Sequence, residues 1–417
     1  MQRIRKAGFV LLFAGFAIAM LGGCASGMNL HTAGATATDV SADRILVTVK
    51  SDSHAGIAEL SPSGRLDYLP PAPEQVRAAE RQRALSIASE FSDSFTLRLE
   101  EDWPIPALGV YCFVFRMAEP DPERRERIVA ALAGHPGVES AQPLNFFYPR
   151  ASHDASPADD PLDRIDAIPG TGLFQRASGR NVEIAVIDTG ADLQHEDLAG
   201  ANIVALDLVG DDDDLPAEHH GTSVLGVIAA QRDNGKGIGG YAPDANVLLL
   251  RACWQPRPRD EYAVCNSFTL AKALSYALQS DAAIVNLSVA GPRDPLLERL
   301  AALLDERGKL LVAAGDSRES FPASVTGSIV AAALLADSAD GVMTLLPDDR
   351  YAIRQGTSIQ AARVTGIATL IRELAPSIDV AELHQRLARL RTESAETVFA
   401  DLLKPAAGRV RKVSATR

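Results

Sequence analysis

The sequence is short of cysteine, of positive charge and of internal repetition. Only four of its 417 residues are cysteine. Lysine and arginine number 41 against 54 aspartate and glutamate residues, which gives a net charge of -13 and a pI near 5.1. A chain this acidic lacks the basic surface that nucleic-acid binding requires, so no nucleic-acid partner is expected. No segment repeats at a fixed period, which argues against a repeat architecture.

What is present is a globular composition divided into blocks. Hydrophobic residues make up 47% of the chain and charged residues 23%, values typical of a folded protein with a sizeable core. The length predicts two or three domains. Small and polar stretches predict a tether at 24–43 and a linker at 149–161. They leave two predicted domains, 44–148 and 162–405, followed by a loose tail at 406–417.

The first 23 residues have the layout of an export signal. Three basic residues within the first six precede an uncharged apolar run over 7–20, which is too short to span a bilayer comfortably. The run ends in Leu21-Gly22-Gly23-Cys24, which resembles a bacterial lipobox and implies a lipid on the thiol of Cys24. The expected location is therefore the bacterial cell envelope, with the protein anchored to a membrane and facing the periplasm or the exterior. Ordinary signal cleavage nearby and an uncleaved anchor are the alternatives.

Both predicted domains mix helices and strands. The first reads strand, helix, strand, helix, strand, with strands at 45–49, 110–115 and 138–143 and helices at 73–91 and 124–133. The second alternates apolar strands with helices, which predicts a parallel sheet covered on both faces. Its strands are expected at 182–187, 246–251, 283–288 and 309–313, and its helices at 220–230, 268–279, 294–307, 358–374 and 380–390.

Three short segments of the second domain carry residue types suited to acyl transfer. An apolar strand ends in Asp188, and His220 opens a helix of small residues in the motif His-Gly-Thr. Ser358 follows Gly-Thr at the start of an apolar helix, where backbone N–H groups favour developing negative charge. Each residue also has an ordinary interpretation, as a turn former, a surface histidine and a helix N-cap.

Together and in this order, the three motifs resemble those of the subtilases, the subtilisin-like serine peptidases. The resemblance implies that Ser358 attacks the peptide carbonyl, His220 moves the proton, and Asp188 orients the imidazole. It implies a serine endopeptidase that acts on polypeptides and has an α/β, parallel-sheet catalytic domain. The first domain resembles a subtilase propeptide, a small α+β chaperone and intramolecular inhibitor that would be cut off near Phe147, Tyr148 or the following linker. An unrelated αβ module is the alternative for 44–148.

The resemblance also assigns the substrate-binding segments. One is similar to the family strand that pairs with the substrate backbone, and the other to the floor of the pocket for the residue before the scissile bond. The segments are Ser288, Val289, Ala290 and Gly291, and Ala313, Ala314 and Gly315.

The next residue, Asp316, departs from the family pattern. The family usually has asparagine here, which donates a hydrogen bond to the oxyanion, whereas an ionised carboxylate can only accept one. Three explanations stay open: a protonated Asp316 in a dry site, a slow enzyme or one active mainly at low pH, or a degenerate chain without catalysis. The alternative function is therefore a non-catalytic, subtilase-like envelope lipoprotein that acts as a binding protein.

The remaining cysteines and one acidic run complete the sequence-based expectations. Cys253 and Cys265 flank a polar loop and are expected to form a disulfide in an oxidising compartment, while Cys112 is expected to be buried and free. The run Asp211–Asp214 could attract calcium, which some subtilases bind, but its spacing fits no ordered calcium loop. A solvated acidic loop is favoured, and no cofactor is expected.

Overall fold

The computed structural model describes most of the chain, and the structural statements below concern the residues it describes. The predicted signal, Cys24, Asp211–Asp214, Asp316 and the tail lie outside them, as does the linker from residue 150 onward. Within the described part, no helix has both the length and the apolar character needed to cross a membrane. The described residues are 43–51, 74–149, 173–210, 215–257, 260, 262–315, 318–334, 341–390, 392–393, 395–400 and 402.

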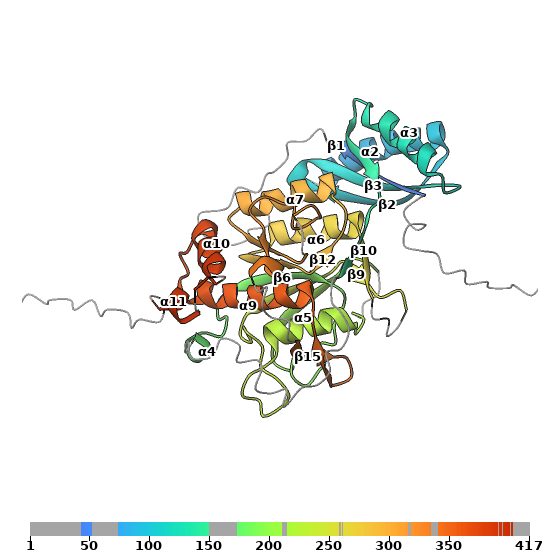
Figure 1. Cartoon of the computed structure of the whole chain (residues 1–417). Helices are drawn as coiled ribbons and strands as arrows, with labels where there is room; N and C mark the ends of the chain where they lie inside the picture. The colour runs from blue at the N-terminus through green and yellow to red at the C-terminus, as the bar shows by residue number, and fades with distance from the viewer. Residues whose placement is uncertain are drawn as a thin grey trace, which may run out of the picture. The chain divides into compact units, whose positions relative to one another are not determined.

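The N-terminal domain is an antiparallel four-stranded sheet, of order β2-β3-β1-β4, with two helices packed on one face (Figure 1). Phe91 and Leu132 of the helices are buried against Phe113 and Phe115 of the sheet. The elements are β1 (Arg44–Lys50), α2 (Glu74–Phe95), β2 (Leu97–Ile105), a 3-10 turn at Pro106–Leu108, β3 (Val110–Met117), α3 (Pro122–Ala133) and β4 (Val138–Pro143).

Strand β1 is buried on both faces of this sheet. Ile45, Val47 and Val49 belong to the cluster that includes α2 and α3, whereas Leu46 belongs to a cluster shared with the C-terminal domain. This division follows from the two-residue period of a strand. A strand covered on both faces requires an uninterrupted apolar run, which is what Ile45-Leu46-Val47 provides. The second face of the sheet therefore joins the N-terminal domain to the rest of the protein.

A buried carboxylate fixes the contact between the two domains. Asp294, the N-cap of α7 (Pro295–Glu306), is fully buried. Its Oδ2 accepts hydrogen bonds from Gln142 Nε2 at 2.7 Å, Asn145 Nδ2 at 2.9 Å and Ser267 Oγ at 2.6 Å. Gln142 and Asn145 come from the N-terminal domain, and Ser267 opens α6 (Ser267–Gln279). One carboxylate thus ties the N-terminal domain to the starts of two helices.

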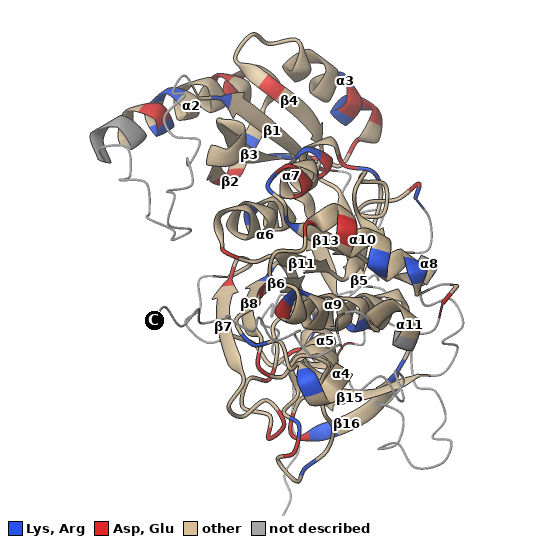
Figure 2. Ribbon diagram, turned by 90° about the vertical axis from the view of Figure 1, so that its left-hand side faces the viewer, with Lys and Arg blue, Asp and Glu red and all other residues tan. Residues whose placement is uncertain are grey.

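The C-terminal domain is built on a six-stranded parallel sheet of order β14-β13-β11-β6-β8-β7, with helices on both faces. Strands β11 and β13, in the middle of the sheet, contain no charged residue, and they are tan in Figure 2. The strands are β6 (Glu183–Asp188), β7 (Asn202–Asp207), β8 (Asn246–Arg251), β11 (Ile284–Leu287), β13 (Leu310–Ala313) and β14 (Ile329–Val330). The other elements are α4 (Leu173–Arg176), α5 (His219–Ala229), α8 (Ala331–Leu334), β15 (Val342–Leu346), β16 (Arg350–Arg354), α9 (Thr357–Leu374), α10 (Val380–Arg389) and α11 (Ala395–Phe399).

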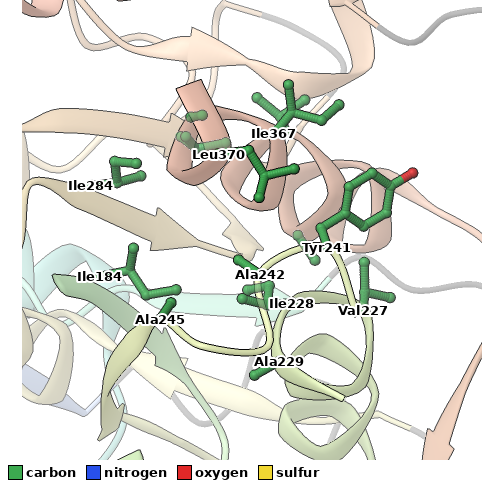
Figure 3. Packing of buried hydrophobic residues seen from close by; sticks show 14 of the residues in the cluster. Ile184, Val227, Ile228, Ala229, Tyr241, Ala242, Ala245, Ile284, Ile367 and Leu370 are labelled. Carbon is green, nitrogen blue, oxygen red and sulfur yellow. The ribbon is translucent and has the colours of Figure 1, made fainter. Parts of the chain in front are cut away.

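Helix α9 is buried along most of its length and packs beside α5. Ile367 and Leu370 of α9 share a cluster with Val227 of α5 and with Tyr241 (Figure 3). A Cβ atom on Gly366 would lie 2.2 Å from the Cβ atom of Tyr241, so only glycine permits this close approach. Buried residues lie on almost every side of the helix, as this central position requires.

A second, smaller sheet combines strands from both domains. Its order is β12-β5-β10-β9, and its pairings are antiparallel. The central strand β5 (Phe146–Pro149) leaves the N-terminal domain and enters between two strands of the C-terminal domain. Those strands are β12 (Val289–Ala290) and β10 (Val264–Asn266), and β9 (Cys253–Trp254) completes the sheet. Strand β5 spans the predicted domain boundary at residue 148.

The predicted fold class is confirmed, since a parallel-sheet α/β domain follows a small α+β domain. The four strands predicted for the second domain correspond to β6, β8, β11 and β13, and its five helices to α5, α6, α7, α9 and α10, each within one or two residues at either end.

Candidate active site

Asp188 lies at the carboxyl end of β6, in the middle of the parallel sheet, and is fully buried. Its Oδ1 accepts a hydrogen bond from the backbone N–H of Thr189 at 2.7 Å. The same oxygen lies 2.6 Å from Nδ1 of His220. The carboxyl ends of parallel strands are the usual location of functional groups in open α/β sheets.

His220 is the second residue of α5 and is 8% exposed. The next residue, Gly221, brings the helix against the loop after β6. Its N–H donates to Thr189 Oγ1 at 2.8 Å, and a Cβ atom here would lie 2.4 Å from the carbonyl oxygen of Gly190. Glycine in the His-Gly-Thr motif is therefore needed for His220 to reach Asp188.

The other ring nitrogen of His220 is poised to accept a proton. With Nδ1 donating to the carboxylate of Asp188, Nε2 is the acceptor of the neutral imidazole. Nε2 is buried and has no hydrogen-bond partner within the described part of the chain. A buried acceptor without a partner is costly in a folded protein, and such groups concentrate at functional sites.

Ser358 is the second residue of α9 and is fully buried. Gly356, which precedes the helix, has φ of 112°, a value that side chains other than glycine rarely tolerate. The Ser358 hydroxyl donates to the carbonyl oxygen of Ser288 at 2.9 Å. The hydroxyl proton turns about the Cβ–Oγ bond, so a donor to this carbonyl can also become a donor to a base.

The predicted substrate-binding segments lie beside Ser358. Leu287 pairs with Ala313 across β11 and β13, and the amide of Ala314 donates to the carbonyl of Leu287 at 3.1 Å. The structure therefore brings Ser288–Gly291 and Ala313–Gly315 together at the same edge of the sheet. Asp316, the predicted oxyanion residue, lies outside the described residues.

A buried polar chain supports the first of these segments. Thr365 Oγ1 of α9 donates to Asn286 Oδ1 at 3.0 Å, and Asn286 Nδ2 donates to Ser288 Oγ at 2.7 Å. All three residues are fully buried. The helix that carries Ser358 is thereby joined to the strand whose carbonyl binds the Ser358 hydroxyl. The sequence analysis missed Asn286 and Thr365, because a polar residue inside an apolar run gives no sign of its partner.

A second group missed by the sequence analysis holds the loops of Asp188 and His220 together. Glu218, directly before α5, is 6% exposed. Its carboxylate accepts from the N–H groups of Gly190 at 2.6 Å and Gln255 at 2.7 Å, and from Arg251 Nε at 2.9 Å. The only available sequence signal was the proximity of Glu218 to the His-Gly-Thr motif.

Arg251 connects this group to the edge of the sheet. Its Nη1 donates to Asp207 Oδ2 at 2.9 Å, and its Nε donates to Glu218. Burial alone would lower the pKa of Arg251, but the two carboxylates outweigh it and raise the pKa above the usual value. Arg251 therefore stays charged between the buried Glu218 and the partly buried Asp207.

Strand β5 lies where the predicted substrate-binding strand would bind a peptide. In the antiparallel register, Tyr148 faces Ala290 and Pro149 faces Val289. On the other side, Phe147 faces Cys265 of β10.

The Phe147 side chain fills a closed apolar site next to this strand. It is fully buried, and its ring centroid lies 5.7 Å from that of Phe321. A Cβ atom on Gly291 would lie 2.3 Å from Phe147 Cδ1, so glycine at 291 leaves room for the ring.

The cysteines occupy two environments. Cys253 and Cys265 form a disulfide between β9 and β10, with a Cα–Cα distance of 4.2 Å. Cys112 of β3 is free and buried, and burial raises the pKa of its thiol. Among the described residues, no three or more His, Cys, Asp or Glu side chains form a group that could hold a metal ion.

Comparisons with known proteins agree with this geometry. The sequence model described as "Subtilase family" matches residues 179–340, a region that contains Asp188 and His220 and ends before Ser358. The chain is 31% identical to the thermophilic serine proteinase of Bacillus sp. (strain AK1), over 72% of this chain and 75% of that protein. It is 30% identical to the major intracellular serine protease of Bacillus subtilis (strain 168), over 46% of this chain and 69% of that protein.

The solved structure of fervidolysin from Fervidobacterium pennivorans, described as a keratinolytic enzyme related to subtilisin, has the same fold. The TM-score is 0.58 at 20% identity, and the match covers 82% of this chain and 56% of that one.

The fold and the paired Asp188 and His220 define the class: a hydrolase on a parallel-sheet α/β scaffold. The comparisons define the family. The chain belongs to the subtilase family and is a subtilisin-like serine endopeptidase.

Proposed function

We propose that Asp188, His220 and Ser358 form the catalytic triad of this endopeptidase. The contact of 2.6 Å between Asp188 Oδ1 and His220 Nδ1, with Nε2 buried and unpartnered, carries the proposal. The carboxylate selects the tautomer in which Nε2 accepts a proton, and it stabilises the imidazolium that results.

In the proposed reaction Ser358 Oγ gives up its bond to the Ser288 carbonyl and rotates toward His220. Nε2 takes the hydroxyl proton as Oγ attacks the peptide carbonyl, and it later protonates the leaving amine. The resulting acyl ester is hydrolysed by water with the same base. The N-terminal amides of α9 provide positive partial charge near the oxyanion.

The nucleophile is tested with a fluorophosphonate probe, which reacts only with an activated serine. We expect the processed wild-type enzyme to be labelled at Ser358 and the Ser358→Ala variant to remain unlabelled. Labelling of neither protein, or of both equally, would contradict the assignment.

The N-terminal domain is proposed to be a propeptide that blocks the substrate site until it is removed. The support is the position of β5 between β10 and β12, with Phe147 buried, and the amide contacts of Gln142 and Asn145 with Asp294. Backbone pairing on both sides holds the segment as a substrate would be held. Cleavage is expected between residues 147 and 161.

Asp316 is the residue expected to limit turnover near neutral pH. An aspartate with a usual pKa of ~3.9 is ionised near neutral pH and cannot donate to the oxyanion. The loss of one such donor costs ~10²–10³ in turnover. Asp316→Asn is therefore expected to raise kcat near neutral pH, and an unchanged or lower kcat would show that the carboxylate does not limit turnover.

The alternative function is that of a non-catalytic binding protein in which the N-terminal domain stays docked. Asp316 and the pairing of β5 with strands on both of its sides favour it. The fluorophosphonate experiment separates the two functions, because a degenerate site would leave Ser358 unreactive.

The proposal also includes the envelope location, which rests on the sequence alone. The predicted signal and Cys24 would make the precursor a lipoprotein whose folded domains lie outside the cytoplasm. Cleavage after β5 would then break the covalent link between the anchor and the catalytic domain. Labelling with an alkyne fatty acid tests the anchor, since Cys24→Ala is expected to abolish the label, and an unlabelled wild-type precursor would refute it.

A further inference from the structure

The two strands that flank β5 receive different parts of it. Tyr148 and Pro149, the last two residues of β5, pair with β12, which directly follows Ser288, the residue whose carbonyl binds the Ser358 hydroxyl. Phe146 and Phe147, the first two, pair with Asn266 and Cys265 of β10. A peptide bound in the same way would use β12 for the residues close to the cut bond and β10 for those farther from it.

Strand β10 is short, and its last residue, Asn266, is held as the N-cap of α6. The strand contains three residues, its outer neighbour β9 contains two, and neither belongs to the six-stranded sheet. A ladder this short is only marginally stable in water. Between the two strands the chain makes an excursion that includes Tyr262, whose side chain is 57% exposed.

The disulfide acts directly on the residue that pairs with Phe147. Cys265 faces Phe147 on one side and Cys253 on the other, so the residue that meets the peptide backbone is itself the cross-linked one. Both cysteines are fully buried, and both belong to the apolar cluster that contains Phe147. The cross-link therefore fixes β10 at the point where it binds an extended chain.

We infer that the Cys253–Cys265 disulfide positions β10 to bind extended peptide substrates. Through this disulfide, the enzyme prefers extended substrates over short ones. The inference rests on the proposed function, because it takes β5 to mark the path of the substrate. A fixed strand offers its N–H and C=O groups without first being ordered, which lowers the entropic cost of binding. A substrate too short to reach β10 gains nothing from it.

The test compares the wild-type enzyme with the Cys253→Ser/Cys265→Ser double variant, both as full-length chains allowed to process. Two substrates are used: a peptide that extends six residues before the cut bond, and an ester of a single amino acid. We expect KM for the peptide to rise about tenfold, the value of one or two backbone hydrogen bonds, with kcat within about twofold. We expect kcat/KM for the ester to stay within about twofold. Cys112→Ala changes a cysteine of the N-terminal domain, which processing removes, so it controls for the effect of cysteine loss on folding and processing and is expected to leave both substrates unaffected.

Two outcomes overturn the inference. Equal losses for peptide and ester would show that the cross-link only stabilises the fold, and no change for the peptide would show that β10 is positioned without it. If the double variant fails to fold, wild type treated with a phosphine decides the question by the same two substrates. The phosphine takes the oxygen of one water molecule to become its oxide, and the disulfide takes up the two electrons released and the two protons of that water to give two thiols. Fluorophosphonate labelling of Ser358 in each preparation separates failure of this inference from failure of the proposed function.

Discussion

The two strands that flank β5 are held in place by different means. Strand β12 continues directly from the core strand β11, and the buried chain Thr365–Asn286–Ser288 fixes it to the helix of Ser358. Strand β10 lies outside the main sheet and is fixed by a disulfide across a sequence separation of 12. A cross-link closing a loop of that size contributes ~3 kcal/mol to stability in the chain-entropy account.

Each of the two flanking strands is expected to control a different kinetic parameter. Because β12 shares its support with Ser358, damage to that support is expected to lower kcat as well as stability. Because β10 meets only the distant part of the bound chain, damage there is expected to act on KM.

The most severe break on the catalytic side is Asp188→Asn. The amide cannot stabilise the imidazolium and favours the wrong tautomer of His220, so kcat is expected to fall ~10⁴-fold, the size of this effect in another serine protease. Steady-state kinetics measure it, and a thermal melt confirms that the variant is folded. A loss of less than about tenfold would contradict the role assigned to Asp188.

The support of β12 is broken by Asn286→Ala. The change leaves Ser288 Oγ and Thr365 Oγ1 buried without their present partner, at an expected cost of about 2–3 kcal/mol in the free energy of unfolding. As the Ser288 carbonyl shifts, kcat is expected to fall about tenfold, within the range known for misplaced catalytic groups. Denaturant unfolding and kinetics measure both effects. Asn246→Ala is the matched control, since Asn246 is exposed at the start of β8; a similar loss in this control would undermine the argument.

The fit between Phe147 and Gly291, the residue directly after β12, is tested by Gly291→Ala. The new Cβ would lie 2.3 Å from Phe147 Cδ1, and the buried ring has no room to retreat. We expect binding of β5 and of extended peptides to weaken about tenfold, with hydrolysis of a short ester unchanged. Gly134→Ala, in the N-terminal domain, controls for the binding of β5 alone, because its nearest atom would lie at 3.5 Å, an ordinary contact. Unaltered peptide KM in Gly291→Ala would show that substrates do not follow the path of β5.

The smallest effect is expected at the contact between domains, from Gln142→Ala. Asp294 loses a donor at 2.7 Å but keeps Asn145 and Ser267, so the cleaved N-terminal domain should dissociate about fivefold more readily. Size-exclusion chromatography of the processed enzyme measures the fraction still bound.

The control for Gln142→Ala is Arg299→Ala. Arg299 pairs with Glu139 at 3.0 Å and is half-exposed, and a pair of this kind contributes little to binding. A larger effect from Arg299 than from Gln142 would reverse the assignment.

The sequence predicted the parts of the fold that apolar segments control. Strands β6, β8, β11 and β13 are mostly buried runs, helices α5, α6 and α9 are buried along most of their length, and the buried residues of α7 repeat with the helical period. Strand β2 was missed because Leu97–Ile105 includes three acidic residues and a proline, and only its pairing with β3 makes it a strand. The hairpin β15–β16 was missed as well. Its sequence signal was the pair Asp348 and Asp349, which form the turn with positive φ at both residues.

The site divides in the same way. Asp188, His220 and Ser358 stand in recognisable local motifs, so their positions could be predicted. Glu218 and Arg251 are 33 residues apart in the sequence. No local sequence pattern predicts their ion pair, because only the fold brings them together. The sequence likewise did not predict the position of β5 between β10 and β12, because this pairing depends on how the N-terminal domain docks.

The central claim is that Ser358 is the nucleophile and that strand β5 of the same chain occupies its substrate site. Intact-mass measurement tests this claim most directly. Purified wild type and Ser358→Ala are incubated side by side at about pH 5 and pH 8, the two sides of the usual histidine pKa. The account predicts that wild type splits between residues 147 and 161 and that Ser358→Ala stays whole. If both chains stay whole at both pH values, or if Ser358→Ala splits as wild type does, the account is contradicted.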